Sequence, residues 1–121
     1  MKTILLVEDE FGIAAALALL LEDEGYRVIS AANGREALAR LIDTVPDLVV
    51  TDLMMPLMDG AALGQALKAN PSWQGIPIVM MSAVPETTLR QQFAGYTVFL
   101  RKPFPIPTLF EQLARILADL S

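Results

Sequence analysis

Short apolar segments and helical patterns alternate along the whole chain. The apolar segments are mostly uninterrupted, which is typical of strands covered on both faces. They predict strands at residues 3–7, 26–31, 48–52, 78–82 and 98–101. The patterns that follow them predict helices at residues 11–24, 33–43, 59–69, 85–93 and 105–120, capping residues included.

Turn and capping residues separate these segments. Gly25 suits the position just after the first helix, where a left-handed backbone is common. Asn33 and Asp59 can cap the second and third helices through their side-chain oxygens. Pro105 and Pro107 are tolerable in the last helix because they fall in or before its first turn.

Strict alternation of strands and helices predicts an α/β fold. Connections of a few residues allow only right-handed crossovers, so the strands form a parallel sheet with helices on both faces. The expected architecture is a flavodoxin-like, doubly wound (βα)5 fold with a five-stranded sheet in the order 2-1-3-4-5. At 121 residues, the chain is expected to form a single domain over residues 1–121.

Composition excludes several classes of function. The chain has no Cys and no His, which removes disulfides, thiol chemistry and the usual imidazole base or metal ligand. Its net charge of −5, with scattered Lys and Arg, argues against direct binding of nucleic acid. The uncharged stretch Phe11–Leu21 is too short to span a membrane, and the N-terminus lacks a signal-peptide pattern. We therefore expect a cytoplasmic protein without membrane contact.

Polar residues stand at the carboxyl ends of four predicted strands. In chain order they are Glu8, Asp9, Asp52, Ser82 and Lys102. Because the first and third strands are neighbours about 4.8 Å apart in this order, three carboxylates converge in one crevice. Such carboxylates repel unless a cation compensates, and their oxygens suit Mg²⁺. A metal, the Lys102 ammonium and the Ser82 hydroxyl would suit an incoming phosphoryl group, with a carboxylate as nucleophile.

Each of these residues also has an ordinary structural explanation. The acidic run 8–10 could simply favour the start of a helix. Asp52 could cap a turn, Ser82 could be a turn residue and Lys102 a solvated surface lysine. Their joint placement at every required strand end favours a functional site.

Four motifs in this order give the chain a resemblance to a known family. They are LLVEDE, LVVTDLMMPLMDG, IPIVMMSA and FLRKPF, and they extend over essentially the whole chain. The chain resembles the receiver domain of two-component response regulators. The resemblance implies that Asp52 is the phosphoacceptor, that Asp9 binds Mg²⁺ directly and that Glu8 acts largely through water. Met54 would offer only its backbone carbonyl to the metal.

The same resemblance implies roles at the ends of the last two strands. Ser82 would be the switch hydroxyl that binds the phosphoryl group, and Ala83 would be small so that the donor can approach. Lys102 would pair with the phosphate, and the Lys102–Pro103 bond would be cis. Phe99 would be the aromatic switch residue, and plain core packing is the alternative for it.

One segment departs from the family pattern. The chain is slightly short between Ser82 and Phe99, and the stretch Phe93–Tyr96 is compressed. We expect the fourth helix, or the loop after it, to be short. Because this side is the usual signalling face, the resemblance leaves open how phosphorylation is transmitted here.

The favoured function is a phosphorylation switch rather than an enzyme. The donor would be a sensor histidine kinase or a histidine phosphotransfer protein, and the target a downstream effector or output domain. A degenerate receiver that binds partners without phosphorylation is the alternative. An aspartate-nucleophile phosphatase is disfavoured because Met54 stands where such enzymes have a second Asp, and the acids after Val7 disfavour a flavin site. Either a single-domain regulator or an excised receiver fits the sequence.

The first helix carries a continuous apolar strip. The residues expected to face the sheet are Ile13, Ala16, Leu17, Leu20 and Leu21. The residues expected to point outward are Phe11, Ala14, Ala15, Ala18 and Leu19, and all of them except Ala14 form the strip. In the family this helix is where the phosphodonor docks, so the strip is a candidate partner face. One alternative is that two copies of the chain form a homodimer through this strip. The other is that the alanines are present only because they favour a helix.

Overall fold

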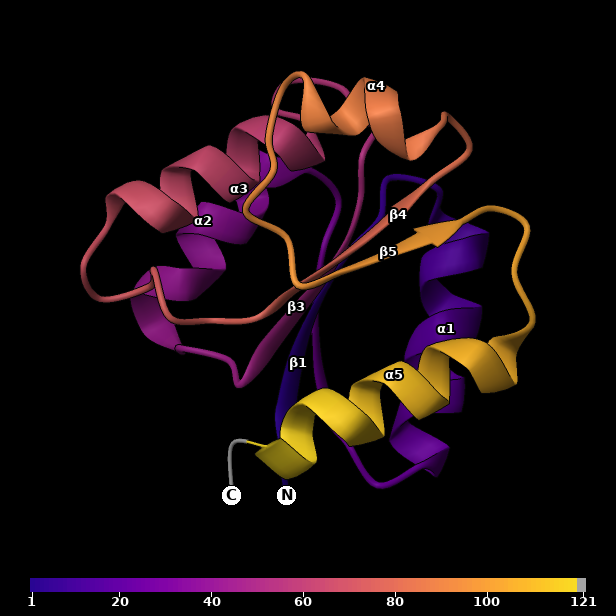
Figure 1. Ribbon diagram of the computed structural model, residues 1–121. Helices are drawn as coiled ribbons and strands as arrows, with labels where there is room; N and C mark the ends of the chain where they lie inside the picture. Colours follow the sequence, from indigo (N-terminus) through magenta and orange to yellow (C-terminus); the bar gives the residue numbers. More distant parts are fainter. Residues whose placement is uncertain (120–121) are drawn as a thin grey trace.

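A parallel sheet with helices on both faces makes up residues 1–119, which are described by a computed structural model (Figure 1). The strands are β1 (Thr3–Val7), β2 (Arg27–Ala31), β3 (Leu48–Asp52), β4 (Ile78–Ser82) and β5 (Val98–Arg101). The helices are α1 (Phe11–Asp23), α2 (Gly34–Asp43), α3 (Gly60–Ala69), α4 (Glu86–Arg90) and α5 (Ile106–Asp119). The strand order is β2-β1-β3-β4-β5, which confirms the predicted flavodoxin-like, doubly wound α/β fold.

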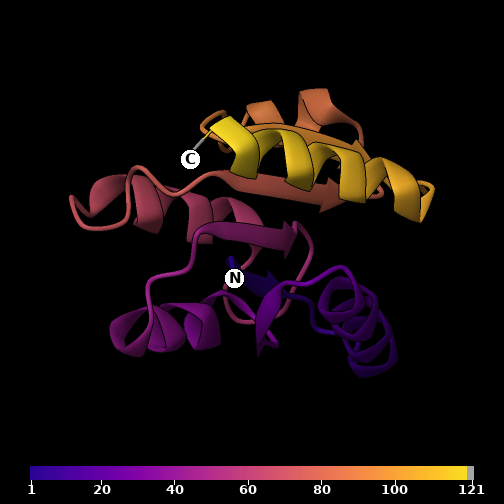
Figure 2. The ribbon, with the colours of Figure 1, turned by 90° about the horizontal axis from the view of Figure 1, so that it is seen from below.

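The sheet separates two hydrophobic cores. Figure 1 shows α1 and α5 on one side of the sheet and α2, α3 and α4 on the other, and Figure 2 shows the strands between these layers. Side chains alternate along β1, so Ile4 and Leu6 enter the α1–α5 core while Leu5 and Val7 enter the α2–α4 core. Because both faces are covered, β3 and β4 are buried along their whole length.

The element boundaries follow the local sequence closely. Gly25 ends α1 with a φ of 97°, and its N–H donates to the Glu22 carbonyl. Asn33 and Asp59 cap α2 and α3 by accepting hydrogen bonds from backbone N–H groups. Each predicted strand is found within a residue of its predicted bounds. Leu120, predicted in the last helix, lies outside the described residues.

Helix α1 is rotated relative to the prediction. Its buried and half-buried apolar residues are Ala14, Leu17, Ala18 and Leu21. The prediction was wrong for Ile13, Ala16 and Leu20, which are exposed. It was also wrong for Ala14 and Ala18, which are half-buried, Ala18 against the α1–α5 core. Because residues 11–21 are apolar almost throughout, the pattern cannot fix the rotation, and packing against the sheet and α5 decides it. Although α1 is apolar, no helix within residues 1–119 is both long enough and apolar enough to cross a membrane.

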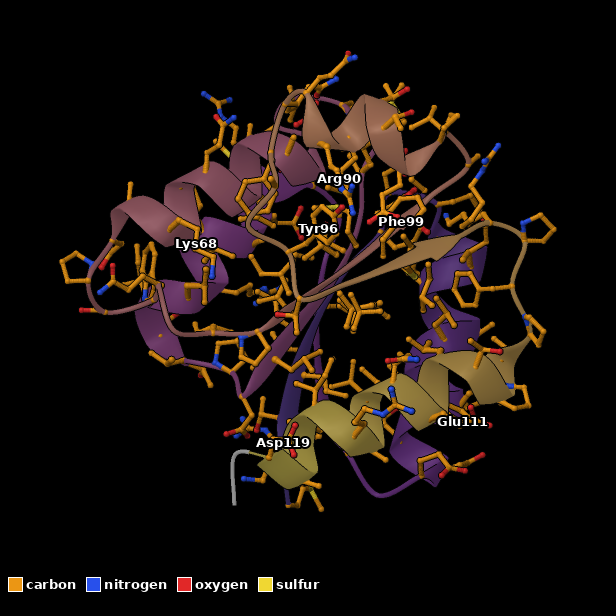
Figure 3. The ribbon with its side chains drawn as sticks, viewed as in Figure 1. Lys68, Arg90, Tyr96, Phe99, Glu111 and Asp119 are labelled. Carbon is orange, nitrogen blue, oxygen red and sulfur yellow. The ribbon has the colours of Figure 1, made fainter. Side chains whose placement is uncertain are left out.

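Helix α4 is short, as the compressed segment before β5 predicts, but the prediction that it reaches Phe93 was wrong. It ends at Arg90, and the Phe93 ring turns inward to cover Gly64 of α3, where a Cβ would lie 2.5 Å from that ring. Tyr96 then returns to α4, where its hydroxyl donates to Glu86 and accepts from Arg90 Nε at 3.0 Å (Figure 3). These contacts take the place of a longer helix.

Candidate functional site

Three carboxylates meet at the carboxyl-terminal edge of the sheet. Glu8 follows β1, and Asp52 ends the neighbouring β3, where Val7 pairs with Thr51. One carboxylate oxygen each of Glu8, Asp9 and Asp52 lies within 4.8 Å of the others. Glu8 and Asp52 are only 3% and 8% exposed, whereas Asp9 faces solvent. The structure therefore brings together the acids that the strand order places side by side.

Lys102 supplies positive charge to this cluster. Its Nζ lies 3.2 Å from Asp52 Oδ2 and 3.3 Å from Glu8 Oε1, so a single ammonium bridges two buried carboxylates. The Lys102 backbone N–H donates to the Ser82 carbonyl at 2.8 Å, which ties the end of β5 to the end of β4. The peptide bond from Lys102 to Pro103 is cis. Lys102 follows β5, which lies two places from β3 with Asp52 and three places from β1, the strand before Glu8.

The ammonium does not balance the buried acids. Burial raises the pKa of Asp52 more than Lys102 and the Leu53 N–H lower it. Burial likewise raises the pKa of Glu8, against the opposing effects of the Glu10 N–H and Lys102. Burial lowers the pKa of Lys102, but the charges of Asp52 and Glu8 outweigh this and leave it raised. Three carboxylates against one ammonium leave an excess of negative charge, which a divalent cation would relieve.

Glu10, the last acid of the run, has a structural role. Its carboxylate accepts hydrogen bonds from the N–H groups of Gly12 and Ile13, at 3.2 and 3.0 Å, and so caps α1. Its own N–H donates to Glu8 Oε2 at 3.1 Å, which orients the buried carboxylate. The helix-start explanation of the acidic run therefore holds for Glu10, while Glu8 and Asp9 belong to the sheet-edge cluster.

Ser82 ends β4, next to β3, and is fully buried. Its Oγ accepts a hydrogen bond from the Val84 N–H at 3.0 Å, which turns the chain past the exposed Ala83. Arg101 Nε donates to the Ala83 carbonyl at 2.8 Å and so holds this turn against β5. Sequence reasoning missed Arg101. Its position at the end of β5, directly before Lys102, was the available signal.

Phe99 and Met54 lie outside the acid cluster. Phe99 on β5 pairs with Met80 and is half-buried against the α2–α4 core. Its ring centroid lies 6.3 Å from that of Tyr96, at an interplanar angle of 54° (Figure 3). Met54 follows Asp52 by two residues, and its side chain is 64% exposed. Phe99 is thus placed where it could act either as a core residue or as the aromatic switch residue.

Two apolar hollows flank α1 near the acids. A cavity of about 310 Å³ lies between α1 and α2, with Phe11 and Ala15 among its lining residues together with Glu8 and Asp9. On the other side of α1, a groove of about 430 Å³ runs between Ile13 and the segment that includes Lys102 and Phe104. Both hollows therefore include charged residues of the sheet-edge cluster in their walls.

The apolar strip predicted on α1 is only partly exposed. Phe11 and Leu19 keep 84% and 64% of their surface exposed, and Ala15 is exposed as well. Ala18 is the exception, because it packs against the α1–α5 core. The exposed apolar surface of α1 is therefore broader than the predicted strip, since it includes Ile13, Ala16 and Leu20.

Comparisons with known proteins agree with this geometry. Residues 4–114 match the family model described as the response regulator receiver domain. Over 118 residues the chain is 36% identical to the phosphate regulon transcriptional regulatory protein PhoB of Pseudomonas aeruginosa, covering 96% of this chain and 52% of PhoB. The chain thus spans about half the length of the first curated relatives it matches.

Solved structures give the same result. The receiver domain of a signal transduction histidine kinase from Syntrophus aciditrophicus superposes with a TM-score of 0.94 at 32% identity, covering 100% of this chain and 93% of that one. The chemotaxis protein CheY4 of Vibrio cholerae superposes with a TM-score of 0.88 at 33% identity, covering 96% of this chain and 98% of that one.

Proposed function

The chain belongs to the response regulator receiver domain family, and from the sheet-edge cluster we propose that Asp52 is its phosphoacceptor. The observation that carries this proposal is the buried Asp52 carboxylate, 3.2 Å from Lys102 Nζ and grouped with two further acids. We propose that residues 1–121 form one receiver domain and that phosphorylation changes its conformation to control an output domain or a separate effector.

The residues at the sheet edge fit Mg²⁺, which receiver domains bind at an acidic pocket. Three carboxylates offer the hard oxygen ligands that this ion prefers. We propose that Asp9 and Asp52 bind it directly and that Met54 adds its backbone carbonyl. Glu8 is held by Lys102 and the Glu10 N–H, which suits a role through water. When bound, Mg²⁺ would neutralise phosphoryl oxygens and part of the acid charge.

The transfer itself is a displacement at phosphorus. A bond forms between an Asp52 carboxylate oxygen and phosphorus while the bond from phosphorus to the donor's histidine nitrogen breaks. The Leu53 N–H holds Asp52 Oδ1 at 3.0 Å and Lys102 faces Oδ2, so the nucleophile is oriented before the donor arrives. Ala83 is small and exposed, which leaves room for the donor.

The phosphoryl group would then reorganise the residues around it. Lys102 gains phosphoryl oxygens as partners, and the Ser82 hydroxyl binds another through a charge-assisted hydrogen bond. The Ser82 Oγ already accepts a hydrogen bond from the Val84 N–H at 3.0 Å. A new hydrogen bond from this hydroxyl to the phosphoryl group would therefore affect the turn at Ala83. Phe99, half-buried beside Tyr96, is proposed to move as the aromatic switch residue.

Two other functions have less support. A degenerate receiver would signal without phosphorylation, but this chain keeps the acids together with Ser82 and Lys102 at the sheet edge. An aspartate-nucleophile phosphatase would have a second Asp two positions after the nucleophile, and here that residue is Met54, which cannot act as an acid or base. We propose a stoichiometric switch.

Receiver domains interact with histidine kinases and output domains. We propose that the phosphodonor, a sensor histidine kinase or a histidine phosphotransfer protein, docks on the exposed apolar surface of α1. Phe11, Ala15 and Leu19 lie on this surface, and the hollows beside α1 include Asp9 and Lys102 in their walls. A homodimer through α1 is the alternative.

Labelling with acetyl phosphate and Mg²⁺, followed by peptide mass spectrometry, tests the phosphoacceptor. We expect one phosphate on Asp52 in the wild type, and none in Asp52→Asn or without a divalent ion. Asp59→Asn is the matched control, because Asn retains the oxygen that accepts from the Ala62 N–H and caps α3. Labelling of another residue in Asp52→Asn would disprove the assignment.

A further inference from the structure

We propose that Gly34, the first residue of α2, is a positioning residue for the loop that joins Asp52 to α3. The inference rests on the proposed function, in which this loop supplies the Met54 carbonyl to a bound metal ion. Gly34 is distant from Asp52 in the sequence, but the fold brings it into contact with the loop that follows Asp52. The loop comprises residues 53–59.

Gly34 and Met58 form a close contact between α2 and this loop. The Gly34 N–H donates to the Met58 carbonyl at 2.9 Å. A Cβ at Gly34 would lie 2.5 Å from Met58 Cγ, 2.9 Å from its carbonyl oxygen and 2.9 Å from its Sδ. Contacts under 3.0 Å require something to shift, and although the Met58 side chain is flexible, the carbonyl oxygen belongs to the backbone of the loop. The absence of a side chain at Gly34 therefore lets the loop lie directly on the start of α2.

The need for glycine here is steric. Among the glycines of residues 1–119, Gly25 has a positive φ and Gly34 does not. An L-residue could therefore adopt the Gly34 backbone conformation without strain. Gly34 begins α2 and is buried, and Asn33 caps the helix by accepting from the Glu36 N–H. An alanine would consequently suit the helix, and the three nearest atoms that its Cβ would meet all belong to Met58.

A displaced Met58 would move the part of the loop nearest the acids. The loop is fixed at both ends, because the Leu53 N–H donates to Asp52 Oδ1 and the Gly60 N–H donates to the Leu53 carbonyl at 2.8 Å. Between these anchors Leu57 has a φ of 67°, a conformation that non-glycine residues rarely adopt. A push at Met58 is therefore absorbed within residues 54–58, which include the proposed metal ligand.

The experiment compares Gly34→Ala, Met58→Ala and the double variant with the wild type by NMR, without and with Mg²⁺. Met58→Ala removes two of the three close contacts while keeping the carbonyl that accepts from Gly34. Gly75→Ala is the matched control, because a Cβ there would have no neighbour within 4 Å. We expect Gly34→Ala to shift the amide resonances of residues 54–58 without Mg²⁺ and to weaken Mg²⁺ binding about tenfold.

In the Met58→Ala background, the same Gly34→Ala change should have a smaller effect on both readouts. If Gly34→Ala alone fails to fold while the double variant folds, the close contact is likewise supported. Unchanged resonances of residues 54–58 in Gly34→Ala, or an equal effect in the Met58→Ala background, would overturn the proposal. The resonances without Mg²⁺ do not depend on phosphorylation, so a wild type that fails to label at Asp52 would overturn the proposed function and not this one.

Discussion

Asp52 and Glu8 are held almost out of water while they share the ammonium of Lys102. Burial raises the pKa of both acids, which means that their ionised forms cost the fold free energy. The fold therefore holds these carboxylates where burial disfavours their charge. Lys102 would retain Glu8 as a partner at 3.3 Å if the Asp52 charge were removed.

Asp52→Asn should raise the free energy of unfolding at neutral pH without divalent ions. The folded-state pKa of Asp52 lies above its unfolded value, so its stabilising effect is present below pH 3.8 and lost as pH rises through the folded pKa. We therefore expect the gain to be larger at pH 7 than at pH 4. Urea unfolding at pH 7 and pH 4 measures it.

The gain from Asp52→Asn should shrink as the pH falls toward 4, because the wild-type carboxyl then becomes protonated in the fold. Asp43→Asn, at the exposed end of α2, is the control and should change little. A gain that does not depend on pH would show that the cause is packing and not the buried charge.

At the scale of elements, α1 and α4 depart most from an ordinary pattern. Helix α1 has no charged residue before Glu22 and exposes Phe11, Ile13 and Leu19. Helix α4 has the length of little more than a single turn and is completed by contacts from Tyr96. One element exposes an apolar surface, and the other is held by hydrogen bonds from a loop side chain.

Ala15→Glu with Leu19→Glu should reduce phosphotransfer from the cognate donor about tenfold, which corresponds to about 1.4 kcal/mol of lost binding. Both residues are exposed, so the fold and labelling by acetyl phosphate should remain. The matched control is Ala114→Glu with Ala118→Glu, which adds the same charges at the same spacing on exposed positions of α5.

Transfer rates and sedimentation measurements distinguish the two partners proposed for α1. Loss of transfer in the α1 variant but not in the α5 variant supports donor docking, and dissociation of a dimer supports self-association. If neither transfer nor oligomeric state changes, α1 has no partner at this surface.

Tyr96→Phe should loosen α4 while keeping the ring beside Phe99. The change removes a hydroxyl that donates to Glu86 and accepts from Arg90, a loss of about 1 kcal/mol. Hydrogen exchange of residues 86–92 should become faster. Tyr26→Phe, at the half-buried tyrosine that follows α1, is the control and should leave this region unchanged.

The pKa of Tyr96 is raised by burial and by its hydrogen bond to Glu86. The contact should therefore be intact below pH 10.0 and be lost as pH rises through the folded value. Exchange of residues 86–92 that is identical in Tyr96→Phe and wild type would show that the hydroxyl does not hold α4.

In the molecule as a whole, the acid cluster lies at the carboxyl-terminal ends of the strands that separate the two cores. β1 and β3 contribute side chains to the α1–α5 core and to the α2–α4 core, and each carries an acid at or just after its end. Repulsion among these acids therefore acts on the strands at the centre of the fold. A cation bound there should stabilise the domain as a whole.

Mg²⁺ at ten times its dissociation constant should stabilise the wild type by about 1.4 kcal/mol. For a domain of this size that corresponds to a rise in Tm of roughly 5 °C. Asp9→Asn should lose most of this response, whereas Asp23→Asn, at the exposed end of α1, should keep it. An equal rise with NaCl at the same ionic strength would show screening in place of a metal site.

The fold and the position of the sheet-edge acids could be predicted from the amino-acid pattern. Unbroken apolar segments identify buried strands, and the residue at which each segment stops must lie at the sheet edge. Parallel strands have their carboxyl ends at the same edge, so Glu8, Asp52 and Lys102 could be placed together from local pattern and strand order alone. The caps Asn33 and Asp59 were equally local, because each side chain bonds within its own helix turn.

How those elements face one another depends on contacts between distant parts of the chain and could not be predicted in this way. The rotation of α1 depends on packing with the sheet and α5, because its sequence is apolar on nearly every side. The end of α4 depends on Phe93 meeting Gly64, and the loop after Asp52 depends on Met58 meeting Gly34. These contacts join residues that are far apart in the chain. A local sequence pattern predicts burial and backbone conformation, but it does not predict which distant residue a side chain will contact.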